Sequence, residues 1–161
     1  MTYPIIIFLL LFALPLGSIA VEHFFLHSTA PLLMLAGKWF VFWPVGIRLF
    51  LAGLRQYFQP RFTAEQIFEI KGNEALPIVR ELGLANLSMG LLGILSLLVP
   101  AFVLPAAIVG GLFYGFAGIN HMAHQGGRNV NRTIAMLTDL YIFLVLAAYV
   151  FIDLLVRANP L

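Results

Sequence analysis

The sequence predicts an all-α integral membrane protein, built as a bundle of about five transmembrane helices. Five long apolar runs occupy most of the 161 residues, and hydrophobic residues make up 61% of the chain while charged residues make up 10%. An average soluble domain carries about 25% charged residues, so this composition indicates a protein embedded in lipid. Backbone amides in hydrocarbon have no water to bond, and runs this long are therefore expected to be helices.

Each apolar run is long enough to cross a bilayer, which takes roughly 20 residues. We expect spans at Tyr3 to Val21, Leu32 to Leu54, Glu81 to Val99, Ala101 to Asn120 and Ile134 to Val156. They leave little chain for any other module, so residues 1–161 are predicted to form a single transmembrane domain. The first run resembles a signal-peptide core, but no Lys or Arg precedes it, and we expect an uncleaved first span.

Basic residues predict the orientation of the bundle. The loop between spans two and three carries Arg55, Arg61, Lys71 and Arg80, and the loop between spans four and five carries Arg128 and Arg132. The positive-inside rule places both loops in the cytoplasm, with the N-terminus inside and the C-terminus outside. The net charge of +2 is too small to indicate a nucleic-acid partner, and membrane lipids are the expected surroundings.

The longest loop is expected to contain a short helix. Thr63-Ala64-Glu65-Gln66 fits a capping box, and Gly72-Asn73 supplies a stop, which predicts a helix from Ala64 to Lys71. Apolar and charged residues alternate along it in a manner typical of a helix lying on the cytoplasmic membrane surface.

Polar residues within the spans gather near the predicted cytoplasmic end. The candidate ligand-binding residues are Arg48, Glu81, Asn86, Asn120, His121, His124 and Asp139. A charge at the centre of a span costs about 2.5 to 3.5 kcal/mol on insertion scales, so Arg48 and Asp139 should face the bundle. We expect Arg48 to pair with Glu81, Asp139 or Asn120. Such groups could simply hold helices together, but the cluster has more ionisable members than packing needs, which favours a substrate or proton site.

Two histidine pairs have spacings that occur in metal sites. His121 and His124 stand at i, i+3, and His23 and His27 at i, i+4. Two imidazoles make at most half of a tetrahedral site, and the predicted topology puts the two pairs at opposite faces of the membrane. We therefore predict no metal site, and the sequence identifies no catalytic residue.

Small residues recur along two spans. Ala107, Gly111 and Gly115 repeat every four residues in the fourth span, and Gly83, Gly90 and Gly93 lie in the third. Such smooth faces allow close helix approach, which favours packing within the bundle, with a homo-oligomer seam as the alternative.

Several stretches resemble a known group of proteins. They are Lys38 to Trp43, Gly53 to Gln56, Pro60 to Glu65, Arg80 to Leu87, Ala117 to His121 and Ala135 to Leu140. Over Lys38 to Leu140, the chain resembles an uncharacterised family of small bacterial multi-pass membrane proteins that is distantly DoxX-like. The resemblance implies a four-helix core with one extra span, a bacterial inner (plasma) membrane location, and a redox or lipophile-binding neighbourhood, because some DoxX-like proteins accompany quinone-linked or membrane oxidoreductase complexes. It implies no particular reaction, so the cofactor stays unknown.

Three functions fit these observations. The leading hypothesis is binding of a small lipophilic or quinone-like molecule in a cytoplasmic-side polar pocket, with a redox complex as the partner. The alternatives are a small proton-coupled transporter or oligomeric pore using Arg48, Glu81 and Asp139, and a structural or lipid-organising protein. A polar path through both leaflets would favour transport, a blind pocket would favour binding, and full mutual pairing without a cavity would favour the structural role.

Overall fold

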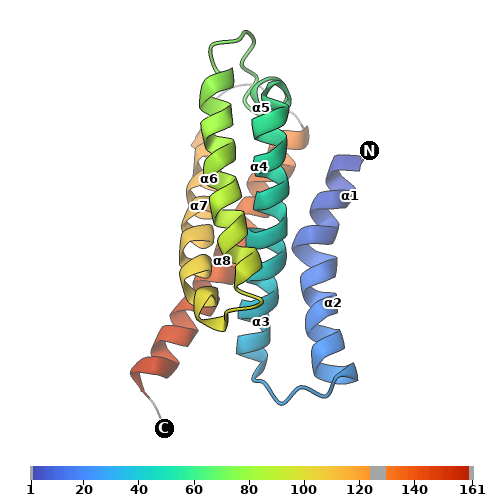
Figure 1. Ribbon diagram of the computed structural model, residues 1–161, viewed down its shortest axis with the longest axis vertical. Helices are drawn as coiled ribbons and strands as arrows, with labels where there is room; N and C mark the ends of the chain where they lie inside the picture. The colour runs from blue at the N-terminus through green and yellow to red at the C-terminus, as the bar shows by residue number, and fades with distance from the viewer. Residues whose placement is uncertain (1, 124–129, 160–161) are drawn as a thin grey trace.

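The computed structural model describes residues 2–123 and 130–159, and these residues form a bundle of long helices (Figure 1). Within them, five helical stretches are long and apolar enough to cross a membrane: Pro4–Phe25, Leu32–Phe58, Leu76–Leu95, Pro100–Ala123 and Thr133–Ala158. All five spans predicted from the sequence are confirmed, with ends shifted by a few residues. The fold is that of a multi-span membrane protein.

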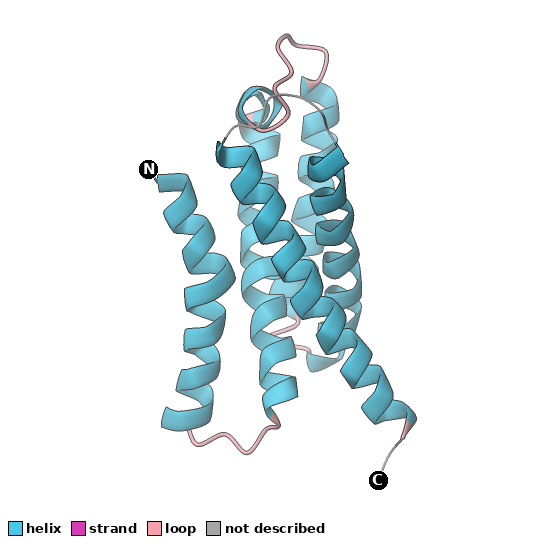
Figure 2. Cartoon of the chain, turned by 180° about the vertical axis from the view of Figure 1, so that it is seen from behind, coloured by secondary structure: helices cyan, strands magenta, loops and turns pink. Residues whose placement is uncertain are grey.

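The first span stands at the edge of the bundle, as both ribbon views show (Figures 1 and 2). It consists of α1 (Thr2–Phe8) and α2 (Leu14–Ala20), which a π-helical segment at Leu9–Ala13 joins, and a second π-helical segment at Val21–Phe25 extends it. Many of its large apolar side chains are exposed, as expected of a helix that contacts lipid.

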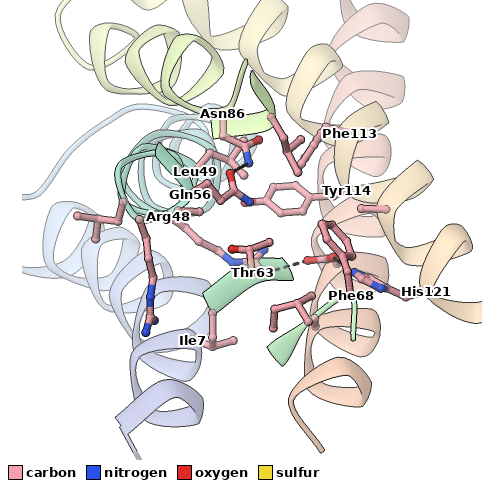
Figure 3. A pocket seen from close by; sticks show the side chains of 18 of the residues that line it. Ile7, Arg48, Leu49, Gln56, Thr63, Phe68, Asn86, Phe113, Tyr114 and His121 are labelled. Carbon is pink, nitrogen blue, oxygen red and sulfur yellow. Dashed lines mark hydrogen bonds and ion pairs between the residues drawn. The ribbon is translucent and has the colours of Figure 1, made fainter. Parts of the chain in front are cut away.

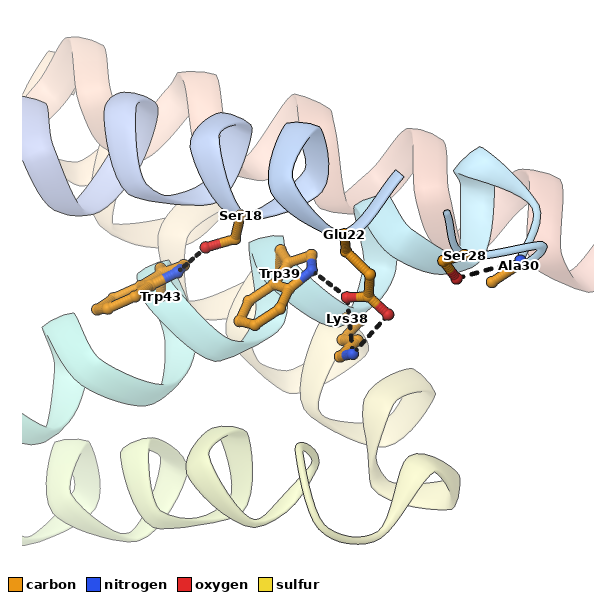
Figure 4. A network of polar contacts seen from close by, with 7 residues as sticks. All are labelled: Ser18, Glu22, Ser28, Ala30, Lys38, Trp39 and Trp43. Atoms are coloured by element: carbon orange, nitrogen blue, oxygen red, sulfur yellow. Dashed lines mark hydrogen bonds and ion pairs between the residues drawn. The ribbon is translucent and has the colours of Figure 1, made fainter. Parts of the chain in front are cut away.

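Polar contacts fasten the far end of the first span to the second (Figure 4). The Glu22 carboxylate accepts hydrogen bonds from Lys38 Nζ at 2.8 Å and from Trp39 Nε1 at 2.7 Å. One turn earlier in the first span, Ser18 Oγ accepts a hydrogen bond from Trp43 Nε1 at 2.9 Å. The first span is therefore held by charge at one end of the bundle, while its N-terminal half makes apolar contacts.

The second span changes helical type at its centre. It runs as α3 (Leu32–Phe40), a π-helical segment (Val41–Arg48) and α4 (Leu49–Phe58). Pro44 lies inside the π segment, where it cannot donate a backbone hydrogen bond and disturbs the regular ladder. The residue that ends this irregular segment is Arg48.

The short helix of the first long loop is present, but its position was predicted incorrectly. The helix α5 spans Pro60–Gln66 instead of Ala64 to Lys71. Pro60 occupies the first turn, where its missing N–H and fixed φ favour helix initiation. The helix therefore starts earlier than the capping-box pattern suggested. Thr63 and Ala64 are buried, because α5 packs against α4 and α6 across one end of the bundle. We call this end the α5 end.

The helices α6 (Leu76–Leu95) and α7 (Val103–Ala123) form a hairpin joined by a short 3₁₀ turn at Pro100–Phe102. The third span begins earlier than the predicted Glu81, because Pro77 lies in the first turn of α6.

The small-residue faces pack within the chain. A Cβ on Gly53 would meet the Gly83 carbonyl oxygen at 2.6 Å, so these two helix backbones lie in direct contact. On α7, Gly115 lies against Phe143, and Gly118 lies against Leu140. Both partners belong to α8 (Val130–Ala158). These glycine faces therefore contact neighbouring helices of the same chain. They do not form a seam with a second copy of the chain.

Candidate functional site

A cavity of about 830 Å³ lies at the α5 end of the bundle. Its walls come from all five spans, and α5 with the residues that follow it contributes Phe62, Thr63, Ile67 and Phe68. The first span supplies a purely apolar wall of Pro4, Ile6, Ile7 and Leu10. Ligand pockets of proteins commonly have volumes of about 300 to 1,000 Å³ and mainly apolar walls, and this cavity has both properties.

Arg48 and Asp139 both line the cavity and form its polar centre. Figure 3 shows Arg48 among the lining side chains. Arg48 Nη2 donates to Asp139 Oδ1 at 2.9 Å, and the two side chains are only 12% and 7% exposed. The Arg48 guanidinium also lies over the ring of Tyr114, 5.0 Å from its centroid. The expectation that Arg48 faces the bundle and pairs with a carboxylate is confirmed.

Tyr114 connects this pair to the irregular part of the second span. Its hydroxyl donates to the backbone carbonyl of Pro44, and its side chain is fully buried. The carbonyl lies within the π segment, where the regular hydrogen-bond ladder is disturbed. The phenol therefore satisfies a main-chain acceptor and holds an aromatic face beside Arg48.

His121 approaches the same carboxylate from α7. Its Nε2 lies 3.9 Å from Asp139 Oδ2, and its side chain is 10% exposed. That separation exceeds hydrogen-bond length, although a charge on the imidazole would still attract the carboxylate. Arg48, His121 and Asp139 thus bring three ionisable side chains from three spans to one point.

A second polar contact lies on the wall formed by α4 and α6. Asn86 Nδ2 donates to Gln56 Oε1 at 2.7 Å, and Asn86 is 2% exposed. Arg55, also on α4, places its guanidinium 3.4 Å from the centroid of the Phe62 ring. This contact joins α4 to α5, the helix that closes the end of the bundle.

The structure brings together most of the residues that the sequence proposed for the site. Arg48, Asn86, Asn120, His121 and Asp139 all line the cavity. His124 lies outside the described residues.

Glu81 is the exception, since it is exposed on α6 and does not line the cavity. It precedes Asn86 by five residues, which at 3.6 residues per turn rotates it about 140° around the helix axis. Asn86 lies on the buried face of α6, and Glu81 therefore points elsewhere. Its predicted place in the polar cluster was wrong.

Sequence reasoning missed Gln56 and Tyr114 as wall residues. Gln56 follows Arg48 by eight residues, so the helical period places both on one face, and that spacing could have identified it. Tyr114 lies within the small-residue stretch of α7 and gives no comparable signal in the sequence.

The described residues contain no group of three or more His, Asp or Glu side chains arranged to hold a metal ion. His23 and His27 lie at the end of the first span that is opposite α5, far along the helix from the cavity-lining Ile7 and Leu10. The polar chemistry of the cavity comes from a paired guanidinium and carboxylate, an imidazole and side-chain amides.

These features define a multi-span membrane protein with a cavity that joins apolar walls to a buried ion pair. The chain belongs to the family of unknown function DUF6790, whose model matches residues 1–158. No curated protein and no solved structure matches it. The prediction of an uncharacterised family is confirmed, and the DoxX-like resemblance stays a prediction.

Proposed function

We propose that this membrane protein binds a small lipophilic, quinone-like molecule in the cavity at the α5 end. The observation that carries the proposal is the combination of about 830 Å³ of space, apolar walls from the first span and α7, and the polar centre of Arg48 and Asp139. An amphipathic molecule with a polar head and an apolar body matches these surroundings. Binding between packed helices also accounts for the irregular second span, because π segments occur often at functional sites.

The packing of the other half of the bundle supports binding over transport. Leu11, Val41 and Val45 lie beyond the cavity wall and are at most 1% exposed. They belong to an apolar core that includes Leu146 and Tyr149 of α8. A proton or solute path would need polar groups through this region. The transporter or pore alternative therefore has less support than a blind binding site, and a cavity of this size does not fit a purely structural role.

The orientation belongs to the same proposal. With the basic loops inside, the α5 end faces the cytoplasm, and the ligand head would lie in the cytoplasmic half of a plasma membrane. A redox complex as the partner is a further expectation, which rests on the resemblance alone.

Native mass spectrometry of the detergent-purified protein tests the proposal. We expect the parent protein to retain a small lipophilic molecule. Ala117 lines the cavity, so Ala117→Leu should fill part of it and reduce retention strongly. Ala148→Leu adds the same volume at an exposed position of α8 and should leave retention unchanged. Absence of any retained molecule from the parent, or equal retention by both variants, would contradict binding in this cavity.

A further inference from the structure

One oxygen of the buried carboxylate has acceptor capacity that the protein does not use. Asp139 Oδ1 accepts the hydrogen bond from Arg48, whereas Oδ2 accepts none from any residue in the described part of the chain. His121 Nε2 lies 3.9 Å from Oδ2, beyond hydrogen-bond length. A carboxylate has about four lone-pair sites, so Asp139 can accept further bonds at Oδ2.

This oxygen belongs to a side chain that lines the cavity and is 7% exposed. An acceptor on the wall of a largely apolar cavity gains free energy when a ligand brings it a donor in place of water. The chemistry of the acceptor therefore restricts the ligand: a hydroxyl group donates to a carboxylate, while a carbonyl or ether oxygen is repelled by it.

A second acceptor without a hydrogen-bond partner lies nearby on α6. Asn86 uses its Nδ2 to bond Gln56, and its Oδ1 has no hydrogen-bond partner among the residues described. Asn86 is also a lining residue. Asn86 Oδ1 is enclosed by the chain, so the acceptor that a ligand in the cavity can reach is Asp139 Oδ2, and it favours a ligand that brings a hydrogen-bond donor.

We propose that the ligand of this cavity is a lipophilic alcohol or phenol, whose hydroxyl donates to Asp139 Oδ2. The inference rests on the proposed function and narrows its ligand class. For a quinone-like molecule it selects the reduced form, which carries hydroxyl groups, over the oxidised form, which carries only carbonyl acceptors. The apolar wall of Ile6, Ile7 and Leu10 receives the hydrocarbon part.

The test compares two probes that differ only in the donor. 4-Dodecylphenol and its methyl ether have the same ring and tail, but the ether has no O–H. Both are titrated against the parent protein in nanodiscs. We expect the phenol to bind about tenfold more tightly, as suits one hydrogen bond to a charged buried acceptor.

The ratio of the phenol affinity to the ether affinity, measured on the parent protein, separates failure of the inference from failure of the proposed function. Two probes that bind equally, or an ether that binds more tightly, would overturn the hydroxyl preference and leave the binding cavity standing. No binding of either probe would count against the cavity as a lipophile site and would remove the inference with it.

A variant links the preference to the carboxylate. Arg48→Met/Asp139→Leu removes both charges, and so eliminates the acceptor without leaving an unpaired ion. The affinities of this variant for the phenol and the ether should differ by no more than about twofold. The matched control is Asp153→Asn, which alters a carboxylate that is bonded to Arg157 and does not line the cavity. The control should keep the full preference. A double variant that keeps the preference for the phenol would show that Asp139 is not the acceptor. The affinity ratio of the parent protein decides the donor preference whether or not the double variant folds.

Discussion

A Cβ atom on Gly93 would lie 2.5 Å from the backbone nitrogen of Gly46, so the third and second spans touch through their main chains. Contacts between real Cβ atoms and backbone are longer than this, and the neighbour here is backbone that cannot rotate away. The close approach lies within the π segment Val41–Arg48, which ends at the cavity. It fixes the distance between the two helices that carry Arg48 and Asn86.

Gly93→Ala should therefore destabilise the bundle. Overpacking of a tight interface costs about 1 to 3 kcal/mol, and we expect a loss of that size in the free energy of unfolding in detergent. Gly17→Ala is the control, because a Cβ at Gly17 meets nothing within 4 Å. Alanine is a better helix former than glycine, so this control should be neutral or stabilising by up to about 1 kcal/mol. Equal stability of the two variants would contradict the close contact.

The Arg48 and Asp139 pair should behave as a unit in unfolding experiments. Arg48→Met alone leaves a buried carboxylate without its cation, and we expect a loss of about 3 to 5 kcal/mol. Arg48→Met/Asp139→Leu removes both charges and should recover most of that loss, since apolar replacements of buried pairs are often neutral or stabilising. Unfolding of the parent and both variants in the same detergent measures the difference. A double variant as unstable as the single would mean that each residue has independent essential contacts.

The orientation can be read from single cysteines, because the sequence contains none of its own. Glu74→Cys lies in the exposed loop before α6, and Asn159→Cys lies exposed at the end of α8. Three spans separate them, so they should be on opposite sides of the membrane. In intact spheroplasts, an impermeant maleimide should label Asn159→Cys at once and Glu74→Cys only after lysis. The reverse pattern would invert the proposed orientation, and labelling of both in intact cells would contradict the arrangement of spans.

The spans were predictable because composition alone decides them. Apolar runs such as 4–25 and 133–158 have no alternative to a helix in lipid, and the cost of burying Arg48 unpaired predicted its carboxylate partner. The membership of several residues in the polar cluster was predictable from their depth in the membrane, because depth can be counted in residues from the end of each span.

Rotation about the helix axis was harder to predict than depth. Glu81 has the right depth in the membrane but the wrong face of α6, and the sequence has no strong amphipathic pattern there to fix the face. The start of α5 was also missed, because Pro60 favours helix initiation ahead of the capping pattern at Thr63. Thr63 and Ala64 are buried within the resulting helix. Tyr114 reaches the site through a contact with the Pro44 carbonyl, 70 positions earlier in the chain, and no local pattern encodes that pairing.

The distance in sequence between the two ends of the buried ion pair has a consequence for how the protein is made. Arg48 and Asp139 are 91 positions apart, and at about 5 to 20 residues per second the ribosome adds the carboxylate roughly 5 to 20 seconds after the guanidinium. During that interval, the second span has the lowest mean hydropathy of the five described spans, 1.4, and holds a cation whose counter-ion does not yet exist. The second span therefore becomes stably inserted only when the last span supplies the carboxylate. Biogenesis of this protein thus ends with the pairing of an early helix and the final one.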